Sequence, residues 1–212
     1  MRKGLFITFE GIDGCGKSTQ VGEAAKRLEK DSIPCLVTRE PGGTPIGEKI
    51  REIILSNDNV EMGAECELLL YLASRAQHVF EKILPAVESG KIVLCDRFQD
   101  ATFAYQGYGR GLSISQLQQL NEFSTRNRAP DLTFIFDCTV DEAAERLKKS
   151  NKAPDRLEGN SRDFHERIRN GYLALAEQNP KRCIIFSGDE SVETLSWKVY
   201  ERIQQLINEI NS

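Results

Sequence analysis

The chain has 212 residues, of which 40% are hydrophobic and 28% are charged, as is usual for a folded globular protein. Lysine and arginine number 28 against 32 aspartates and glutamates, and the net charge of −4 gives no reason to expect a nucleic-acid surface. The sequence contains no run approaching the roughly 20 apolar residues of a membrane span, so we expect no membrane partner.

The first predicted strand, residues 5–9, is a short apolar run rich in β-branched and aromatic residues. The segment that follows, residues 11–18 (GIDGCGKS), is called here the glycine loop; it matches G-x-x-x-x-G-K-[ST], and helix-compatible sequence continues over 19–30. Strand, loop and helix in this order are typical of a phosphate-binding loop, in which Lys17 reaches phosphates and Ser18 binds Mg²⁺. The alternative, a plain glycine turn with a chance lysine, is disfavoured by four matching fixed positions.

Further strands are predicted from four short continuous apolar runs. These are residues 34–39, 91–96, 132–137 and 182–187, with helical patterns near 46–56, 65–89, 113–128, 140–150, 161–178 and 191–210. Continuous runs favour a parallel sheet covered by helices on both faces. We therefore predict a single α/β domain over residues 1–212, with a five-stranded parallel sheet. Gly107, Gly109 and Gly111 predict a flexible loop.

Ligands of such sheets gather at the carboxyl ends of the strands. Candidates there are Glu10, Arg39 and the pair Asp96-Arg97, because a carboxylate can orient a metal-bound water and a guanidinium can bind a phosphate. Surface salt bridges are the alternative for the pair. The segment 39–44 (REPGGT) and Arg51 in the next helix can equally be a turn and a solvated side chain.

A basic lid is predicted over about residues 146–160. The basic residues in and beside it are Arg146, Lys148, Lys149, Lys152, Arg156 and Arg162. Such a run is usually a solvated face, but Pro154 and Gly159 interrupt this one after the fourth strand. Closing such a lid over a polyphosphate would exclude water and stabilise a transferring phosphoryl group.

The motifs G-x-x-G-x-G-K-S-T, T-R-E-P-G-G-T, D-R-F-x-D…A-Y-Q-G and D-R-L-E together resemble the bacterial thymidylate kinases, with matches spread over residues 6–172. The resemblance implies the nucleoside-monophosphate kinase fold. It also implies phosphoryl transfer from ATP to dTMP, giving dTDP and ADP for dTTP synthesis, with Mg²⁺ as cofactor. A cis peptide bond between Glu40 and Pro41 is a further implication.

The same resemblance implies an ATP site. Its residues would be Gly11, Asp13, Gly14, Cys15, Gly16, Lys17, Ser18, Thr19 and Arg146, the last against the adenine. The implied catalytic residues are Lys17, Arg97, Asp96, Asp13 and Arg156. Ser18 and Asp96 would bind Mg²⁺ directly or through water, and Arg156 would be the lid cation that reaches the transferring phosphoryl group.

The resemblance also implies a dTMP site. Arg51 and Arg97 would hold the phosphate, and Glu158 would be a further contact on the acceptor side. The implied nucleoside contacts are Tyr71 against thymine, Arg75 at its carbonyl edge, Thr102 and Gln106 at the base, and Tyr105 on the deoxyribose. Two positions depart from the family pattern: Gly14-Cys15 lacks an arginine found in one branch, and Ala101 replaces a frequent serine.

Other functions remain open at this point. A GTPase switch is disfavoured, because residues 151–155 (NKAPD) are one residue too long for N-K-x-D and residues 96–99 (DRFQ) lack the glycine of D-x-x-G. A kinase for dUMP, CMP or a deoxynucleoside is the nearest enzyme alternative, and a nucleotide-gated binding module is the non-enzyme alternative. The predicted 65–89 helix is apolar on more than one face, which favours a homodimer.

The six cysteines stand singly, without a C-x-x-C pair. Three of them lie in apolar runs, where a thiol behaves as a small hydrophobe, and this pattern suits a reducing compartment. The first apolar run is also too short for a signal peptide. We therefore expect a cytoplasmic protein.

Overall fold

The computed structural model of the chain describes residues 3–149 and 153–211. Within them, five parallel strands form one sheet in the order β2-β3-β1-β4-β5. The strands are β1 (Leu5–Glu10), β2 (Cys35–Arg39), β3 (Ile92–Asp96), β4 (Leu132–Asp137) and β5 (Cys183–Ser187). The predicted parallel sheet is confirmed, and each strand lies within one residue of its predicted bounds at either end.

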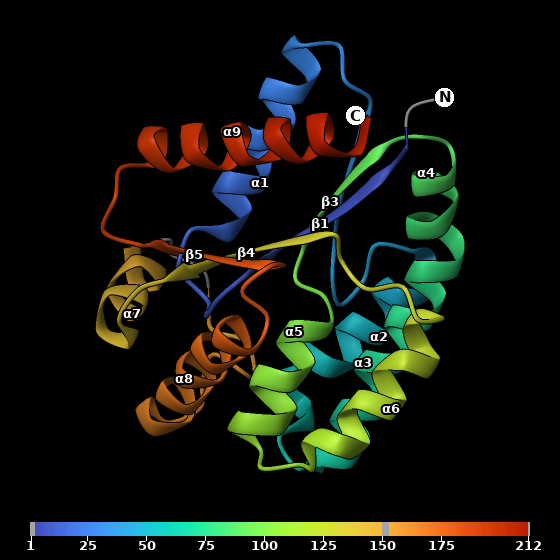
Figure 1. The fold of residues 1–212 in the computed structure, drawn as a ribbon. Coiled ribbons are helices and arrows are strands. Elements are labelled where there is room, and N and C mark those ends of the chain that lie inside the picture. Colours follow the sequence, from blue (N-terminus) through green and yellow to red (C-terminus); the bar gives the residue numbers. More distant parts are fainter. Residues whose placement is uncertain (1–2, 150–152, 212) are drawn as a thin grey trace.

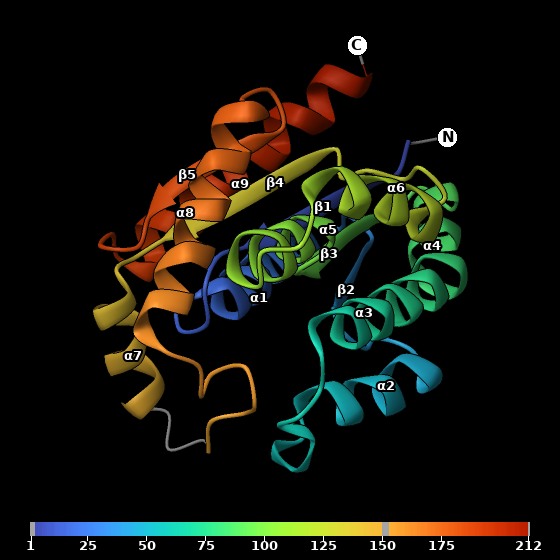
Figure 2. The same ribbon diagram turned by 90° about the horizontal axis from the view of Figure 1, so that it is seen from below.

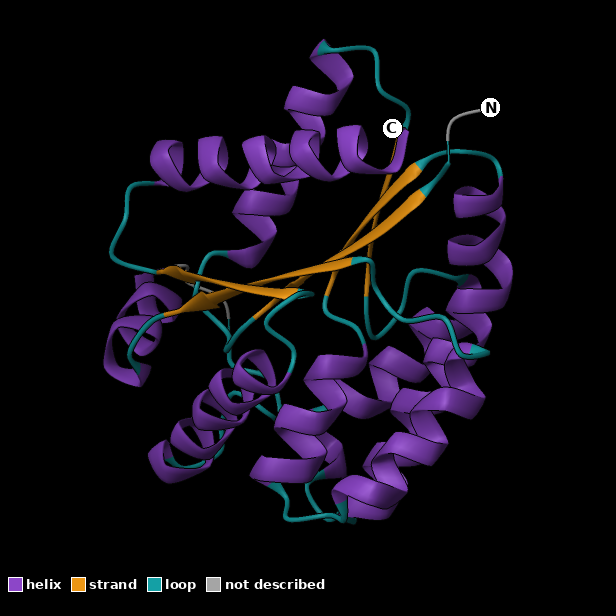
Figure 3. Ribbon diagram, in the orientation of Figure 1, coloured by secondary structure: helices purple, strands orange, loops and turns teal. Residues whose placement is uncertain are grey.

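Helices cover both faces of this sheet (Figures 1 and 3). The helices are α1 (Lys17–Lys30), α2 (Pro45–Leu55), α3 (Ala64–His78), α4 (Leu84–Glu88), α5 (Gln99–Thr102), α6 (Ile114–Thr125), α7 (Val140–Lys149), α8 (Arg162–Gln178) and α9 (Val192–Asn211). Helices α1 and α9 lie on one face, and α5 and α8 lie on the other (Figure 1). None of the helices in the described part of the chain has both the length and the apolarity to span a membrane.

The central strands are buried along almost their whole length, whereas the edge strands β2 and β5 are partly exposed. This difference follows from position, because an edge strand has a neighbour on one side only. Phe134 in the middle of β4 packs its ring 5.4 Å from the ring of Phe9 and 5.6 Å from that of Phe186. Aromatic side chains from three neighbouring strands thus form one continuous core layer.

Replacing Phe134 by alanine is expected to lower the free energy of unfolding by about 3–5 kcal/mol, because it removes a fully buried ring and leaves a cavity. Chemical denaturation monitored by circular dichroism measures this change. Val60, which is 75% exposed, provides the control, since Val60→Ala should change stability by less than about 0.5 kcal/mol. Equal effects of the two substitutions would contradict the placement of Phe134 in the core.

The predicted 65–89 helix is continuous but not uniform. Helix α3 passes into a π-helical stretch, η2 (Val79–Ile83), which leads into α4. Pro85 stands in the first turn of α4. Proline lacks the N–H that an α-helix would require there, and a π-helical bulge is one of the known ways in which a helix accommodates such a break.

The expected flexible loop at Gly107 and Gly109 is wrong. Helix α5 continues as a π-helical stretch, η3 (Phe103–Gly109), which contains both glycines. A Cβ at Gly107 would lie 2.6 Å from Cδ1 of Ile114, and a Cβ at Gly109 would lie 2.9 Å from Cε2 of Phe164. The glycines are needed here for close packing of η3 against α6 and α8, and not for a turn.

Candidate active site

The glycine loop joins the end of β1 to the start of α1, in the order that the sequence predicts. Its backbone turns sharply, with positive φ at Gly11, Gly14 and Gly16. At Gly14 the space is also restricted, since a Cβ would lie 2.5 Å from the carbonyl oxygen of Ala143 in α7. The ammonium group of Lys17 turns back over the loop and donates to the carbonyl oxygen of Ile12 at 2.8 Å. A positive charge is thereby held over the glycine loop.

An oxygen pair lies at the mouth of the loop. The hydroxyl of Ser18 donates to Oδ2 of Asp96 at 2.5 Å. The sheet brings the two together, because β3 is the hydrogen-bonded neighbour of β1 and Asp96 is paired with Phe9. Hydroxyl and carboxylate oxygens are the donors that Mg²⁺ prefers, so the residues present fit this ion.

Arg97 lies between the glycine loop, which contains Asp13, and η3, which contains Tyr105. Its Nη2 donates to Oδ1 of Asp13 at 2.6 Å, while the hydroxyl of Tyr105 donates to Oδ2 of the same carboxylate at 2.9 Å. Burial alone would raise the pKa of Asp13, but the charges of Arg97 and Lys17 and the Tyr105 hydrogen bond hold it well below its ordinary value. Asp13 is therefore a carboxylate at neutral pH, and it fixes one edge of the guanidinium.

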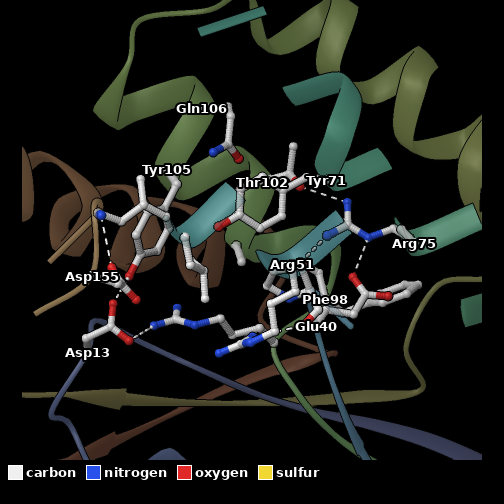
Figure 4. A pocket seen from close by; sticks show the side chains of 15 residues that line it. Asp13, Glu40, Arg51, Tyr71, Arg75, Phe98, Thr102, Tyr105, Gln106 and Asp155 are labelled. Atoms are coloured by element: carbon white, nitrogen blue, oxygen red, sulfur yellow. Dashed lines mark hydrogen bonds and ion pairs between the residues drawn. The ribbon is translucent and has the colours of Figure 1, made fainter. Parts of the chain in front are cut away.

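Two pockets meet at this point. The lining of the inner pocket includes Arg51, Tyr71, Arg75, Thr102, Tyr105 and Gln106 (Figure 4). The loop pocket is wider, and it extends along the glycine loop to Arg146 and to the segment from Gly188 to the start of α9. The residues that line both pockets are Asp13, Glu40, Arg51 and Arg97.

Arg75 forms the polar end of the inner pocket, and it is 1% exposed. Its Nε donates to Glu40, Nη1 donates to Thr102 and Asn121, and Nη2 donates to the carbonyl oxygen of Phe98, at 2.7–2.9 Å. A guanidinium has five N–H donors, so one Nη2 hydrogen has no partner among the described residues. That hydrogen is the donor that Arg75 can offer to a bound ligand.

The other side chains of the inner pocket combine an aromatic ring with amide and hydroxyl groups. Tyr71 and Arg75, one helical turn apart on α3, both line it, as their spacing predicts. Burial raises the pKa of Tyr71 above its ordinary value, which keeps the phenol neutral. Gln106 is buried, and its amide donates to Glu67 at 2.9 Å. The pocket therefore offers a flat, uncharged wall and a polar end.

Arg51 and Arg146 both line the loop pocket. Nη1 of Arg51 donates to the carbonyl oxygen of Pro41 at 2.9 Å, beside the Glu40–Pro41 peptide bond, which is cis as the resemblance implies. Nη2 of Arg146 donates to the carbonyl oxygen of Gly188 at 2.9 Å. Thr19 and Glu158 also line the loop pocket. The loop pocket is thus lined by a cation from α2 and by another from α7.

Arg156 contacts α2 and α3 in this structure. Its Nε donates to the carbonyl oxygen of Ile54 at 2.8 Å, and its Nη2 pairs with Glu67 at 2.7 Å. It is not among the described residues that line either pocket, and its place beside a transferring phosphoryl group stays a prediction. Asn151 and Lys152 of the predicted lid lie outside the described residues.

The reason for this position is the carboxylate of Glu67, which is 0% exposed. Burial raises the pKa of Glu67, but hydrogen bonds from Arg110, Gln106 and Arg156 outweigh burial and lower it overall. A buried carboxylate without such partners would carry a large desolvation cost. Arg156 is therefore paired with the first turn of α3. The side-chain amide of Asn57 also donates to the carbonyl oxygen of Pro154 at 3.1 Å, so the chain leading into α8 contacts the chain between α2 and α3 (Figure 2).

Some pocket residues were not predicted as contacts. Asp155 and Leu157 line the inner pocket, and Glu40 lines both pockets. Each of them belongs to a motif recognised in the sequence, D-R-L-E or T-R-E-P-G-G-T. Membership of these motifs is the sequence signal that could have identified them as pocket residues.

Comparison with known proteins agrees with this geometry. A family model described as thymidylate kinase matches residues 9–199. The chain is 49% identical to a thymidylate kinase of Halothermothrix orenii over 204 residues, which are 95% of this chain and 97% of that protein. It is 50% identical to a thymidylate kinase of Kosmotoga olearia over 199 residues, covering 94% and 93% of the two chains.

The fold is also similar to that of a solved protein. The crystal structure of thymidylate kinase from Ehrlichia chaffeensis superposes with a TM-score of 0.76 at 33% identity, covering 94% of this chain and 98% of that one. Similarity in sequence and in structure thus extends over nearly the whole chain, including both pockets. The chain belongs to the thymidylate kinase family.

Proposed function

We propose that this chain transfers the terminal phosphoryl group of ATP to the phosphate of dTMP, producing dTDP and ADP for dTTP synthesis. The observation that carries the proposal is the meeting of two pockets at Asp13, Glu40, Arg51 and Arg97. Phosphoryl transfer requires the two phosphates in line and close together, which this shared wall permits. Family membership supports the same reaction.

The loop pocket is proposed as the ATP site. The amides of the glycine loop, residues 11–18, and the Lys17 ammonium would bind the phosphates, with Thr19 at the start of α1 and Arg146 near the adenine. Ser18 and Asp96 would hold Mg²⁺, directly or through water, and the ion would neutralise charge on the phosphate oxygens. Their oxygens lie at the mouth of the loop, which supports this arrangement.

The inner pocket is proposed as the dTMP site. Tyr71 offers a face for the thymine ring, while Arg75, Thr102 and Gln106 line the polar end. Tyr105, which is 5% exposed, would pack on the deoxyribose. The acceptor phosphate would be bound by Arg51 and Arg97, with Glu158 as a further contact on the acceptor side.

The chemistry requires no covalent intermediate on the protein. The phosphate of dTMP is already ionised at neutral pH, so Asp13 and Asp96 are proposed to position groups and not to remove a proton. The transition state spreads negative charge over the transferring oxygens, and aligned cations stabilise it. Lys17 and Arg97 supply these cations. Arg156 is proposed as the lid cation that reaches the transferring phosphoryl group when the lid closes. Its contact with Glu67 in this structure fixes the segment 153–158 against α3.

A panel of acceptors with ATP tests the proposal, using ADP release as the measurement. Release that depends on dTMP and is much weaker with dUMP, CMP or thymidine is the expected result. Selectivity for another acceptor would identify a kinase of different specificity. Binding of ATP without acceptor-dependent ADP release would identify a nucleotide-gated module instead. Faster turnover with GTP than with ATP would contradict the donor assignment.

We also propose that the chain acts as one domain over residues 1–212 in the cytoplasm, as a homodimer. Support for the dimer comes from large apolar side chains on α3, η2 and α6 that are exposed in a single copy: Leu69 at 57%, Phe80 at 55% and Phe123 at 84%. Helix α3 packs against both η2 and α6, so the three segments that carry these side chains are neighbours. Burying this region against a second copy would remove it from water.

The substitution Leu69→Glu is expected to convert the dimer to a monomer, because it places a charge in the proposed interface. Sedimentation or size-exclusion chromatography with light scattering measures the mass. Val60→Glu, at a position that is 75% exposed outside α3 and α6, should leave the mass unchanged. A wild-type chain that already runs as a monomer would contradict the proposal.

A further inference from the structure

The backbone of Arg97 has an unusual conformation. Its φ is +70°, in the left-handed region that residues with a side chain rarely adopt. Such a conformation costs free energy and persists only where the surroundings hold it. The groups that hold Arg97 are therefore of interest, because they decide where its guanidinium points.

Glu10, the last residue of β1, holds the peptide that follows Arg97. Its Oε1 accepts a hydrogen bond of 2.7 Å from the backbone N–H of Phe98, and the N–H of Arg97 itself donates to the carbonyl oxygen of Phe9 at 3.0 Å. Glu10 is fully buried. The end of β1 therefore holds the backbone on both sides of the left-handed residue.

Tyr172 on α8 holds the side chain of the same residue. Its hydroxyl donates to Oε2 of Glu10 at 2.9 Å and accepts from Nη1 of Arg97 at 3.1 Å. Nη1 also donates to the carbonyl oxygen of Gly11 at 2.9 Å. Both hydrogens of Nη1 are thus engaged by the protein, whereas Nε has no hydrogen-bond partner among the described residues.

This arrangement divides the guanidinium into two parts. Nη1 faces the protein and is fixed by Tyr172 and Gly11, and Nη2 faces Asp13 at the wall shared by the two pockets. A cation that must meet a transient charge is most effective when it is oriented beforehand, because no reorganisation is then required. Fixing Nη1 provides that orientation.

Burying the polar groups of Glu10 and Tyr172 lowers the stability of the folded chain. Glu10 and Tyr172 are 0% and 2% exposed, and burial together with the charge of Asp100 raises the pKa of Glu10 to about 8, despite the opposing charge of Arg97. A buried carboxyl group held by the Phe98 N–H and the Tyr172 hydroxyl is expensive compared with a well-packed apolar side chain. Packing therefore does not explain the pair, whereas the control of Arg97 does.

We propose that Glu10 and Tyr172 are positioning residues for phosphoryl transfer, with Glu10 fixing the backbone at Arg97 and Tyr172 fixing its guanidinium. This inference rests on the proposed role of Arg97 at the phosphates. Neither Glu10 nor Tyr172 touches the substrates, and both act through Arg97.

Kinetics of Tyr172→Phe test the side-chain contact. Removing the hydroxyl is expected to lower kcat with ATP and dTMP by about tenfold, the effect of one lost hydrogen bond of about 1.4 kcal/mol, and to raise KM for dTMP but not KM for ATP. The matched control is Tyr108→Phe on η3. Its hydroxyl has no hydrogen-bond partner among the described residues, and its ring packs beside Gly171 of α8. The control should retain wild-type kinetics.

Two variants of Glu10 test the backbone contact. Glu10→Gln keeps an oxygen for the Phe98 N–H and is expected to lose only about threefold in kcat, whereas Glu10→Ala loses both contacts and should lose about a hundredfold. A kcat of Glu10→Gln close to that of the wild type supports a positioning role for Glu10. A Glu10→Gln protein with unchanged melting temperature that is as impaired as Glu10→Ala would overturn the Phe98 contact as the basis of the effect. If Glu10→Ala does not fold, the kinetics of Glu10→Gln and Tyr172→Phe still test the proposal.

The double variant Tyr172→Phe/Arg97→Ala separates positioning from general structural damage. If Tyr172 acts through Arg97, the double variant should be no slower than Arg97→Ala. Effects that multiply, or a Tyr172→Phe enzyme with wild-type constants, would overturn this inference and leave the proposed reaction intact. A fully active Arg97→Ala enzyme would instead remove the proposed role of Arg97, and with it this inference.

Discussion

Arg97→Ala is expected to lower kcat for dTMP phosphorylation by about a thousandfold, a magnitude typical of losing a cation that acts on a transferring phosphoryl group. The guanidinium lies at the wall shared by both pockets, so one substitution removes charge from the acceptor phosphate and from the transition state together. Steady-state ADP release with ATP and dTMP measures the loss.

The fold should survive this substitution. Alanine keeps a Cβ at the left-handed position, so the backbone cost stays, and the lost ion pair to Asp13 lies at a partly exposed carboxylate. Circular dichroism melting checks this expectation. Arg202→Ala provides the control, because Arg202 pairs with Glu209 on α9 and is not among the described residues of either pocket. Wild-type turnover in Arg97→Ala would refute the role given to Arg97.

Lys17→Met is expected to lower kcat by about a hundredfold or more and to weaken ATP binding, because the ammonium is the cation held inside the glycine loop. Methionine has a similar length and no charge, so the loop loses its positive charge with little change in volume. ADP release and calorimetric titration with ATP measure the two effects.

The same helix offers a matched control. Lys26 also lies on α1, with a side chain that is 72% exposed and pairs with Glu23 at 2.6 Å. Lys26→Met should leave both constants unchanged. If Lys17→Met bound and used ATP as the wild type does, the glycine loop could not be the phosphate site.

The sheet and the glycine loop were predictable because local sequence determines them. A continuous apolar run such as residues 132–137 can be buried on both faces, and helices on both sides provide that burial. Glycine is likewise required by the local backbone at Gly11, Gly14 and Gly16, where φ is positive. In both cases the residue type needed at each position is specified by its immediate surroundings.

The position of Arg156 was not predictable in this way. Its partner Glu67 is 89 residues away in the sequence, and both side chains are buried together only in the folded chain. The basic pattern around Arg156 indicates an exposed lid, and nothing local reveals a buried carboxylate that needs a cation. Gly107 and Gly109 show the same limit, because their close neighbours belong to α6 and α8.

The left-handed backbone at Arg97 also restricts which residues this position can accept. Glycine would relax the backbone by about 1 kcal/mol, but it would also remove the guanidinium that bonds Gly11, Tyr172 and Asp13. Each lost hydrogen bond costs about as much as the relaxed backbone would return. Heat-resistant variants of this chain are therefore expected to keep arginine here, although its backbone conformation is unfavourable.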